Sequence, residues 1–197
     1  MRLGFLASHR GSGMQAVLDA CASGRLAATP AVAISNNRDA EALVRAARAG
    51  VPHCHLSRAT HPEPDALDGA ILDALCSHGV ELVLLTGYLR PLGPRTLAHY
   101  PGRVLNAHPA LLPRFGGPGM YGDRVHAAVL EAGVTETGVT IHVVDGEYDT
   151  GPIVGQCVVD VWPGDTVATL GERVLAREHA FLVETLQRIV AGGVLAR

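Results

Sequence analysis

The sequence predicts an α/β protein with a doubly wound, mostly parallel, Rossmann-like sheet. Three observations indicate this fold. Short apolar runs alternate with segments of helical periodicity through the first half of the chain, which is typical of parallel strands joined by right-handed helical crossovers. Residues 82–85 form an uninterrupted apolar run, as strands buried on both faces do. A short link between the last two expected strands predicts an antiparallel strand near the C-terminal end.

Apolar runs and helical spacing place the elements in chain order. The first half contains expected strands at residues 3–7, 31–34, 53–56 and 82–85, separated by helices at 14–21, 40–47 and 66–76. A brief helix then leads into a strand that ends at His108. Asp123 is expected to cap the helix that follows. That helix is expected to end at Gly133. Two strands follow, at residues 138–144 and 153–161. A long last helix begins at Asp165 and stops at the glycines 192 and 193.

Composition limits the class of protein. The 197 residues fit one domain, because a chain of this size buries about 70% of its unfolded surface. A net charge of −3, 4% aromatic residues and the lack of a dense Lys/Arg run argue against a nucleic-acid partner. No apolar run approaches the roughly 20 residues of a membrane-spanning helix, and the N-terminus does not resemble a signal peptide. The four cysteines lie far apart without a CxxC pair, so we expect reduced thiols in a cytoplasmic protein.

The strongest candidate site is the segment from residue 104 to residue 113. Alternation along a strand puts the side chains of Asn106 and His108 on the same face. Pro109 removes a backbone donor and ends regular pairing, so both side chains lie at the carboxyl edge of the sheet, where open α/β sheets bind ligands. A lone buried histidine is more often a hydrogen-bonded core residue. The neighbouring amide and the position at a strand end favour a catalytic role instead.

The glycine loop after the first strand, Gly11-Ser12-Gly13, is a candidate anion site. Free backbone N–H groups at the start of a helix, together with the helix dipole, attract a phosphate. The loop also fits a dinucleotide-binding pattern. Asn36 and Asn37 stand where NAD binding requires an acidic residue, whereas Arg38 keeps NADP open. A tight turn without a ligand is the third interpretation.

Two carboxylates are further candidates. Asp149, in the acidic turn 145–152, would reach the same sheet edge as His108, orient its imidazole and favour the protonated form. A solvated acidic hairpin is the alternative, and the spacing of the turn does not match a calcium-binding loop. Glu178 falls within the apolar stripe of the last helix, so it either meets a buried cation or accepts hydrogen bonds from a polar ligand. For His142 a core role and a site role both stay open, and the cysteines are interpreted as packing residues.

Three segments together resemble the folate-dependent formyltransferases. They are Asn106-Ala107-His108-Pro109-Ala110-Leu111-Leu112-Pro113, Gly138-Val139-Thr140-Ile141-His142-Val143-Val144 and Asp149-Thr150-Gly151-Pro152-Ile153. The likeness runs from the first strand to the last helix and implies the formyltransferase fold. It implies catalytic roles for Asn106, His108 and Asp149, a substrate phosphate held by Gly11, Ser12 and Gly13, and a ribonucleotide contact at Glu178. The implied folate pocket consists of Leu89, Arg90, Pro91, Leu92, Asp145, Gly146, Glu147 and Tyr148.

The resemblance also implies an activity. The enzyme would transfer the formyl group of its co-substrate 10-formyltetrahydrofolate to the amine of glycinamide ribonucleotide in purine biosynthesis. The amine would attack directly through a tetrahedral intermediate, without an acyl-enzyme and without a metal. Residues 1–100 would form the mononucleotide-binding half of one domain spanning 1–197, and residues 101–197 the catalytic and folate-binding half. We expect a cytoplasmic monomer or homodimer with no nucleic-acid or membrane partner.

The sequence departs from the family pattern in three places. Gly13 stands where Asn is common, Pro64 stands where some members have an Arg near the folate tail, and the loop 115–122 has a variant form to which no individual roles are transferred. The related methionyl-tRNA and formyltetrahydrofolate-hydrolysing enzymes carry an added domain, which is not expected here. An NADP-dependent reductase and a non-catalytic folate-binding module are the rivals from other classes. The second has no need for the three polar residues of the formyltransferase motif.

Overall fold

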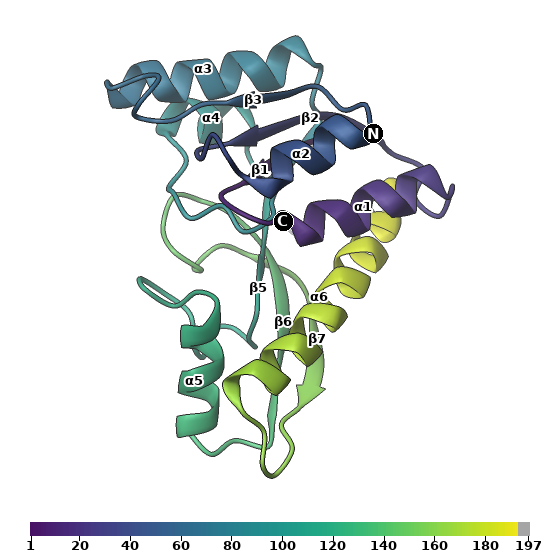
Figure 1. Ribbon diagram of the computed structural model, residues 1–197, viewed down its shortest axis with the longest axis vertical. Coiled ribbons are helices and arrows are strands. Elements are labelled where there is room, and N and C mark those ends of the chain that lie inside the picture. The colour runs from purple at the N-terminus through teal and green to yellow at the C-terminus, as the bar shows by residue number, and fades with distance from the viewer. Residues whose placement is uncertain (193–197) are drawn as a thin grey trace.

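The computed structural model describes residues 1–192 and shows a central sheet covered by helices (Figure 1). Its strands are β1 (Arg2–Ala7), β2 (Thr29–Ser35), β3 (His53–His55), β4 (Leu82–Leu85), β5 (Val104–His108), β6 (Glu136–Val143) and β7 (Ile153–Asp160). Its helices are α1 (Ser12–Ala22), α2 (Glu41–Arg48), α3 (Pro64–Ser77), α4 (Pro94–His99), α5 (Asp123–Glu131) and α6 (Val167–Val190). The elements expected from the sequence are therefore present in the expected order.

The seven strands form one sheet in the order β3-β2-β1-β4-β5-β6-β7. All neighbouring pairs from β3 to β5 are parallel, which follows from the helical crossovers that return the chain to the same edge. Strand β6 runs antiparallel to both β5 and β7. The predicted fold class, including its antiparallel strand near the C-terminal end, is confirmed.

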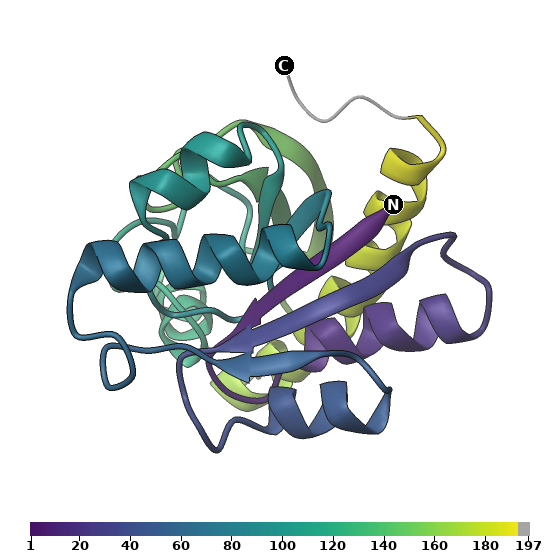
Figure 2. The same ribbon diagram turned by 90° about the horizontal axis from the view of Figure 1, so that it is seen from above.

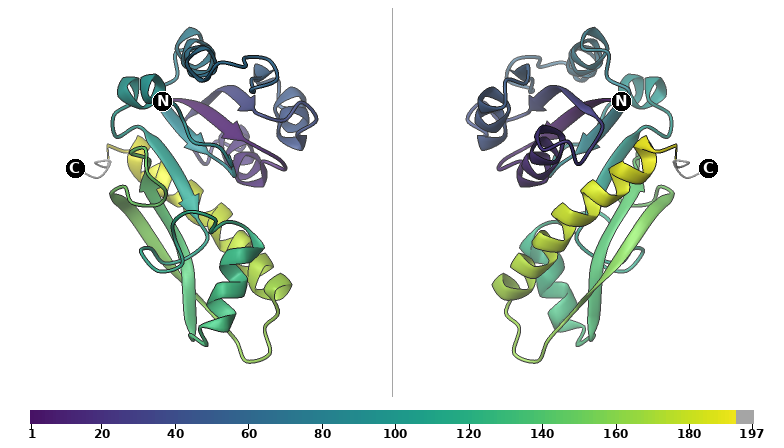
Figure 3. Two further views of the ribbon diagram at one scale, coloured as in Figure 1. Left: turned by 90° about the vertical axis from the view of Figure 1, so that its left-hand side faces the viewer. Right: turned by 90° about the vertical axis from the view of Figure 1, so that its right-hand side faces the viewer.

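The sheet separates two hydrophobic cores. Alternation along β1 sends Phe5 into the core on one face and Leu6 into the core on the other. Helices α1 and α2 cover the first face of strands β1 to β3, and α3 and α4 lie on the second (Figure 2). Helix α6 runs diagonally beside β6 and β7 and also packs against α1 and α5 (Figure 3). This places one long helix next to both halves of the sheet.

Two details at the helix ends differ from the expectations, and the end of α6 agrees with them. Asp123 does not cap α5, because it is the first helical residue and no side chain bonds the N-terminus there. Thr166, not Asp165, is the N-cap of α6, and its side chain accepts a hydrogen bond from the Thr169 N–H. Helix α6 ends before Gly192, whose positive φ of 92° allows the chain to turn. The predicted stop at residue 193 and the domain end at 197 lie outside the described residues.

Two further features concern the class of protein. None of the helices within residues 1–192 has the length and apolar character needed to cross a membrane. All four cysteines are free thiols, as expected; Cys76 is exposed and the others are half-buried.

Candidate active site

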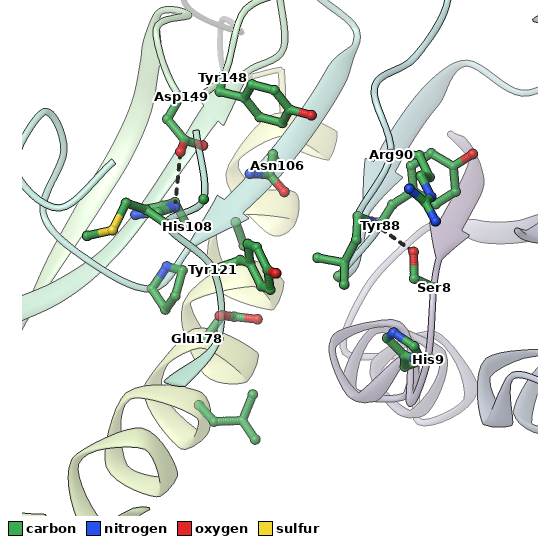
Figure 4. Close-up of a pocket in the computed structure, with 18 of the residues that line it drawn as sticks. Ser8, His9, Tyr88, Arg90, Asn106, His108, Tyr121, Tyr148, Asp149 and Glu178 are labelled. Atoms are coloured by element: carbon green, nitrogen blue, oxygen red, sulfur yellow. Dashed lines mark hydrogen bonds and ion pairs between the residues drawn. The ribbon is translucent and has the colours of Figure 1, made fainter. Parts of the chain in front are cut away.

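A cavity of about 540 Å³ lies at the carboxyl edge of the sheet, between the ends of β1, β4 and β5 and the helix α6 (Figure 4). This is the edge at which open α/β sheets bind ligands. The polar residues that line it include Ser8, His9, Asn36, Arg90, Asn106, His108, Tyr148, Asp149 and Glu178. The structure thus brings together the amide, the imidazole and both carboxylates that the sequence singled out.

The register between β5 and β6 positions the polar groups of this cavity. Asn106 is paired with His142 across the two strands, and His108 is paired with Thr140. Directly opposed side chains on one face of an antiparallel pair lie within contact distance. Asn106 Nδ2 accordingly lies 3.2 Å from His142 Nε2. The Asn106 amide is therefore in contact with the His142 imidazole, whose Nε2 also faces Asp149.

Thr140 anchors the loop that follows His108. Its hydroxyl donates a hydrogen bond of 2.7 Å to the Ala110 carbonyl and accepts one of 3.0 Å from the Leu112 N–H. Gln156, on β7, donates to the same hydroxyl and to the Leu112 carbonyl, both at 2.9 Å. Because these groups are buried or half-buried, breaking one would leave a polar atom without a partner. The loop is thus tied to two strands directly beyond the histidine.

The carboxylate of Asp149 is shared by two imidazoles. Its Oδ2 lies 3.5 Å from His108 Nδ1, and its Oδ1 lies 3.5 Å from His142 Nε2. The Gly117 N–H also donates to Oδ2 at 2.9 Å. Gly116 also makes room at this point, since a Cβ there would clash with Leu112 Cδ2 and lie 3.3 Å from the Asp149 Cβ. His142 therefore belongs to the site and not only to the core, because it contacts both the Asn106 amide and the Asp149 carboxylate.

Burial and hydrogen bonding act against each other on Asp149. Burial alone would raise the pKa of its carboxyl group, but His142, the Gly117 N–H and the nearby charge of His108 more than offset that effect. The pKa of Asp149 consequently lies below its ordinary value. The carboxylate is ionised at neutral pH.

Opposing effects act on the pKa of His108. Burial lowers the pKa of His108 below its ordinary value, and the Asp149 charge and the Phe115 carbonyl raise it by less than burial lowers it. Its Nε2 lies 2.8 Å from the Phe115 carbonyl oxygen, while Nδ1 faces Asp149. Both nitrogens therefore face acceptors, and only the imidazolium has a proton for each. Protonation of His108 would therefore give each of these two acceptors a hydrogen-bond donor.

Glu178 has no buried cation beside it. Within the described chain its carboxylate takes part in no ion pair, and burial raises its pKa to about 7. A Cβ added to Gly13 would lie 3.8 Å from its Oε1, so the carboxylate stands next to the start of α1. The sequence left two interpretations of Glu178 open, a buried ion pair and hydrogen bonds to a polar ligand. The structure favours the second.

The glycine loop lies beside the cavity without lining it. Gly11 is the N-cap of α1 with φ 61°, and no side chain caps this helix. A Cβ on Gly11 would lie 2.7 Å from the Ala42 Cβ, so glycine is required there both for the backbone and for the space. Ser12 is half-buried and Gly13 is buried.

The expected folate segments are only partly brought together. Leu89 and Arg90 line the main cavity, whereas Pro91 and Leu92 line a neighbouring cavity of about 490 Å³ that shares Arg90 with it. In the acidic turn, Tyr148 reaches the main cavity. The exposed residues Asp145, Gly146 and Glu147 are not among those that line it. Each of the two segments assigned to the folate pocket therefore has some residues that line the main cavity and others that do not.

Several lining residues escaped the sequence analysis. The Ser8 hydroxyl donates to Asn36 Oδ1 at 2.6 Å and accepts from the Leu89 N–H at 2.8 Å. It thereby joins the ends of β1, β2 and β4. The sequence did contain a signal for Ser8, since it is a polar residue at the end of an apolar run, as Asn106 is. Tyr121 and His126, in and after the variant loop, also line the cavity, and no sequence pattern marked them.

The chain is similar to known proteins in sequence and in fold. Residues 1–186 match the family described as formyl transferase. The chain is 42% identical over 193 residues to the phosphoribosylglycinamide formyltransferase of Mycobacterium tuberculosis, covering 98% of this chain and 86% of that protein. It is 38% identical to the chloroplastic phosphoribosylglycinamide formyltransferase of Arabidopsis thaliana, covering 95% of this chain and 65% of that protein. The crystal structure of glycinamide ribonucleotide transformylase 1 from Symbiobacterium toebii aligns with a TM-score of 0.90 at 41% identity, covering 98% of this chain and 88% of that one.

Proposed function

The chain belongs to the formyl transferase family, and we propose that it transfers the formyl group of 10-formyltetrahydrofolate to the amine of glycinamide ribonucleotide in purine biosynthesis. The observation that carries this proposal is the meeting of Asn106, His108 and Asp149 in one cavity. Three polar groups from distant segments around one space suit acyl transfer to an amine. Family membership also favours this activity over an NADP-dependent reductase.

Asn106 stabilises the negative charge that develops on the formyl oxygen. When the amine attacks the formyl carbon, its electron pair forms a C–N bond and the carbonyl electrons move to oxygen. One Nδ2 hydrogen of Asn106 faces His142, and the second is free to bind this oxyanion. A preorganised donor of this kind is typically worth about 3 kcal/mol in the transition state.

His108 and Asp149 handle the proton. The attacking amine becomes cationic in the tetrahedral intermediate and must lose a proton, while the departing folate nitrogen must gain one. The Asp149–His108 pair takes up this proton, and in the protonated pair the imidazolium faces Asp149 through Nδ1 and the Phe115 carbonyl through Nε2. The proton then passes to the leaving nitrogen. No acyl-enzyme is formed, and the donor and acceptor exchange the formyl group directly.

The two substrates occupy opposite sides of the reacting groups. The N-terminus of α1, with Gly11, Ser12 and Gly13, binds the phosphate of the ribonucleotide, and Glu178 contacts its polar sugar. Leu89 to Leu92 and the acidic turn 145–148 bind the folate. Holding both substrates in place can remove on the order of 7 to 11 kcal/mol from the barrier. In this proposal residues 1–100 form the mononucleotide-binding half, to which Leu89 to Leu92 add folate contacts. Residues 101–197 form the catalytic and folate-binding half, to which Glu178 adds a nucleotide contact, in a cytoplasmic monomer or homodimer.

A direct assay tests this proposal. The purified chain is mixed with glycinamide ribonucleotide and 10-formyltetrahydrofolate, and formation of tetrahydrofolate and formylated ribonucleotide is followed. The expected result is equal, stoichiometric formation of both products. Release of formate in place of the formylated product would assign a hydrolase and refute the transfer. The Asn106→Ala variant is the matched control, because it removes the oxyanion donor from the cavity without changing the number of charges.

A further inference from the structure

One buried imidazole in the cavity has no part in the mechanism above. His126 lies on α5 and is only 5% exposed, yet it lines the same cavity as Asn106, His108 and Glu178. Its Nδ1 is buried and has no hydrogen-bond partner among the described residues. Buried polar atoms without partners are rare and costly, so such an atom in a cavity calls for a functional explanation.

Helix α6 keeps a slot open for this ring. Opposite His126 stands Gly171, where a Cβ would lie 3.1 Å from the ring Cδ2 and 3.5 Å from Nε2. Glycine inside a helix lowers helix stability, and here it makes room for the imidazole edge. The ring is therefore packed in a defined orientation. Of the two ring nitrogens only Nδ1 is both buried and without a partner, so Nε2 is the atom that we assign to a ligand in the cavity.

The slot lies on the path of the ribonucleotide. Gly171, Val174 and Glu178 are spaced i, i+3 and i+7 and so share one face of α6. Val174 and Glu178 both line the cavity. A substrate that contacts Glu178 and extends along this face reaches His126 close to the reacting groups. The part of the substrate next to the reacting groups is its glycinamide arm.

The charge state of His126 suits a neutral ligand group. Burial lowers its pKa below the ordinary value, and the charge of His108 lowers it further, against the smaller opposing effect of Asp123. At neutral pH the ring is uncharged and carries one N–H. Placing that hydrogen on Nε2 leaves a bare lone pair on buried Nδ1, which is the cheaper atom to leave without a partner.

We propose that His126 is a substrate-binding residue whose Nε2–H donates a hydrogen bond to the amide carbonyl oxygen of the glycinamide arm. This inference rests on the proposed function, because it assumes the ribonucleotide as the acceptor. It assigns a specificity contact to a residue of α5 that no sequence pattern marked.

Steady-state kinetics of three variants test the proposal. His126→Phe fills the slot without nitrogen and is expected to raise the KM for the ribonucleotide about tenfold, the effect of one lost hydrogen bond, while the KM for the folate changes less than twofold. His126→Gln places an amide near Nε2 and should restore most of the affinity. His126→Asn places it near Nδ1 and should not. Thermal unfolding of each variant shows whether the fold is kept.

Several outcomes would overturn the proposal. An unchanged KM for the ribonucleotide in His126→Phe would refute it, and so would equal increases for both substrates. If the Phe variant does not fold, equal ribonucleotide KM values for the Gln and Asn variants would refute it instead. An unaltered enzyme without any transfer activity would refute the proposed function together with this contact. An active enzyme with an unaffected Phe variant would refute the contact alone.

Discussion

His142 Nε2 lies 3.5 Å from Asp149 Oδ1, the carboxylate oxygen that does not face His108. This contact joins the acidic turn after β6 to the strand itself. Because His142 is also paired with Asn106 across the β5–β6 ladder, it connects the amide and the carboxylate of the site. One imidazole therefore positions two groups to which we assign different roles, oxyanion binding and proton transfer.

Asp149→Asn should nearly abolish turnover. The amide preserves the size of the side chain but removes the charge that stabilises protonated His108, so kcat should fall by roughly 10²- to 10⁴-fold. Circular dichroism should show an unchanged fold. A variant with the rate of the unaltered enzyme would refute the proton-transfer role.

His142→Leu should lower kcat by on the order of tenfold to a hundredfold, because the amide of Asn106 loses its anchor and the oxyanion donor is displaced. The KM values should change little. The double variant with Asn106→Ala should lose less than the sum of the two single effects, since both act through one donor. Strict additivity would show that His142 does not act through Asn106.

Glu178→Ala should raise the KM for the ribonucleotide much more than the KM for the folate. The carboxylate lies beside the start of α1, where the proposed phosphate site is. The proposed folate pocket, which includes Tyr148, is formed by other segments of the chain. Initial rates at varied concentrations of each substrate measure both constants. Equal increases would contradict the assigned contact.

Glu178→Gln should stabilise the fold at high pH. The folded pKa of Glu178 is about 7 and the ordinary value is 4.5. Between these values the unfolded chain ionises while the folded protein stays protonated, so stability is lost as pH rises from 4.5 to 7. Gln avoids this loss, and the free energy of unfolding should increase by on the order of 2 kcal/mol at pH 8.

Urea unfolding at pH 8 and pH 4 measures that difference, which should vanish at pH 4, where both states carry a proton. Glu172→Gln, at an exposed position of the same helix, is the matched control and should show little change at either pH. A Glu178→Gln variant less stable than the original at pH 8 would mean that the carboxylate is satisfied in the folded protein.

Alkylation of the cysteines should leave transfer intact. None of the four lines the main cavity, and burial raises the pKa of Cys21, Cys54 and Cys157, which slows their reaction. Cys76 is exposed and should react first. Iodoacetamide labelling followed by mass spectrometry and assay tests this. Stoichiometric inactivation by the label, together with a formyl-cysteine trapped in the unlabelled enzyme, would overturn direct transfer.

The sequence by itself determined the fold class and the core of the site. Alternating strand and helix periodicity specified a parallel sheet, because each segment can bury its apolar residues in only one arrangement. Period-two spacing and a following proline were sufficient to put Asn106 and His108 at one sheet edge. Both inferences depend only on residues near one another in the chain, which is why they were accessible without a structure.

Only the tertiary structure brought His142 and His126 to the site and set the direction of the pKa shift of His108. The contact of His142 with Asp149 depends on cross-strand register and on the path of a turn. The state of His108 depends on a balance in which burial outweighs a nearby carboxylate. Register and burial arise from packing between distant segments, and no local pattern encodes their magnitude.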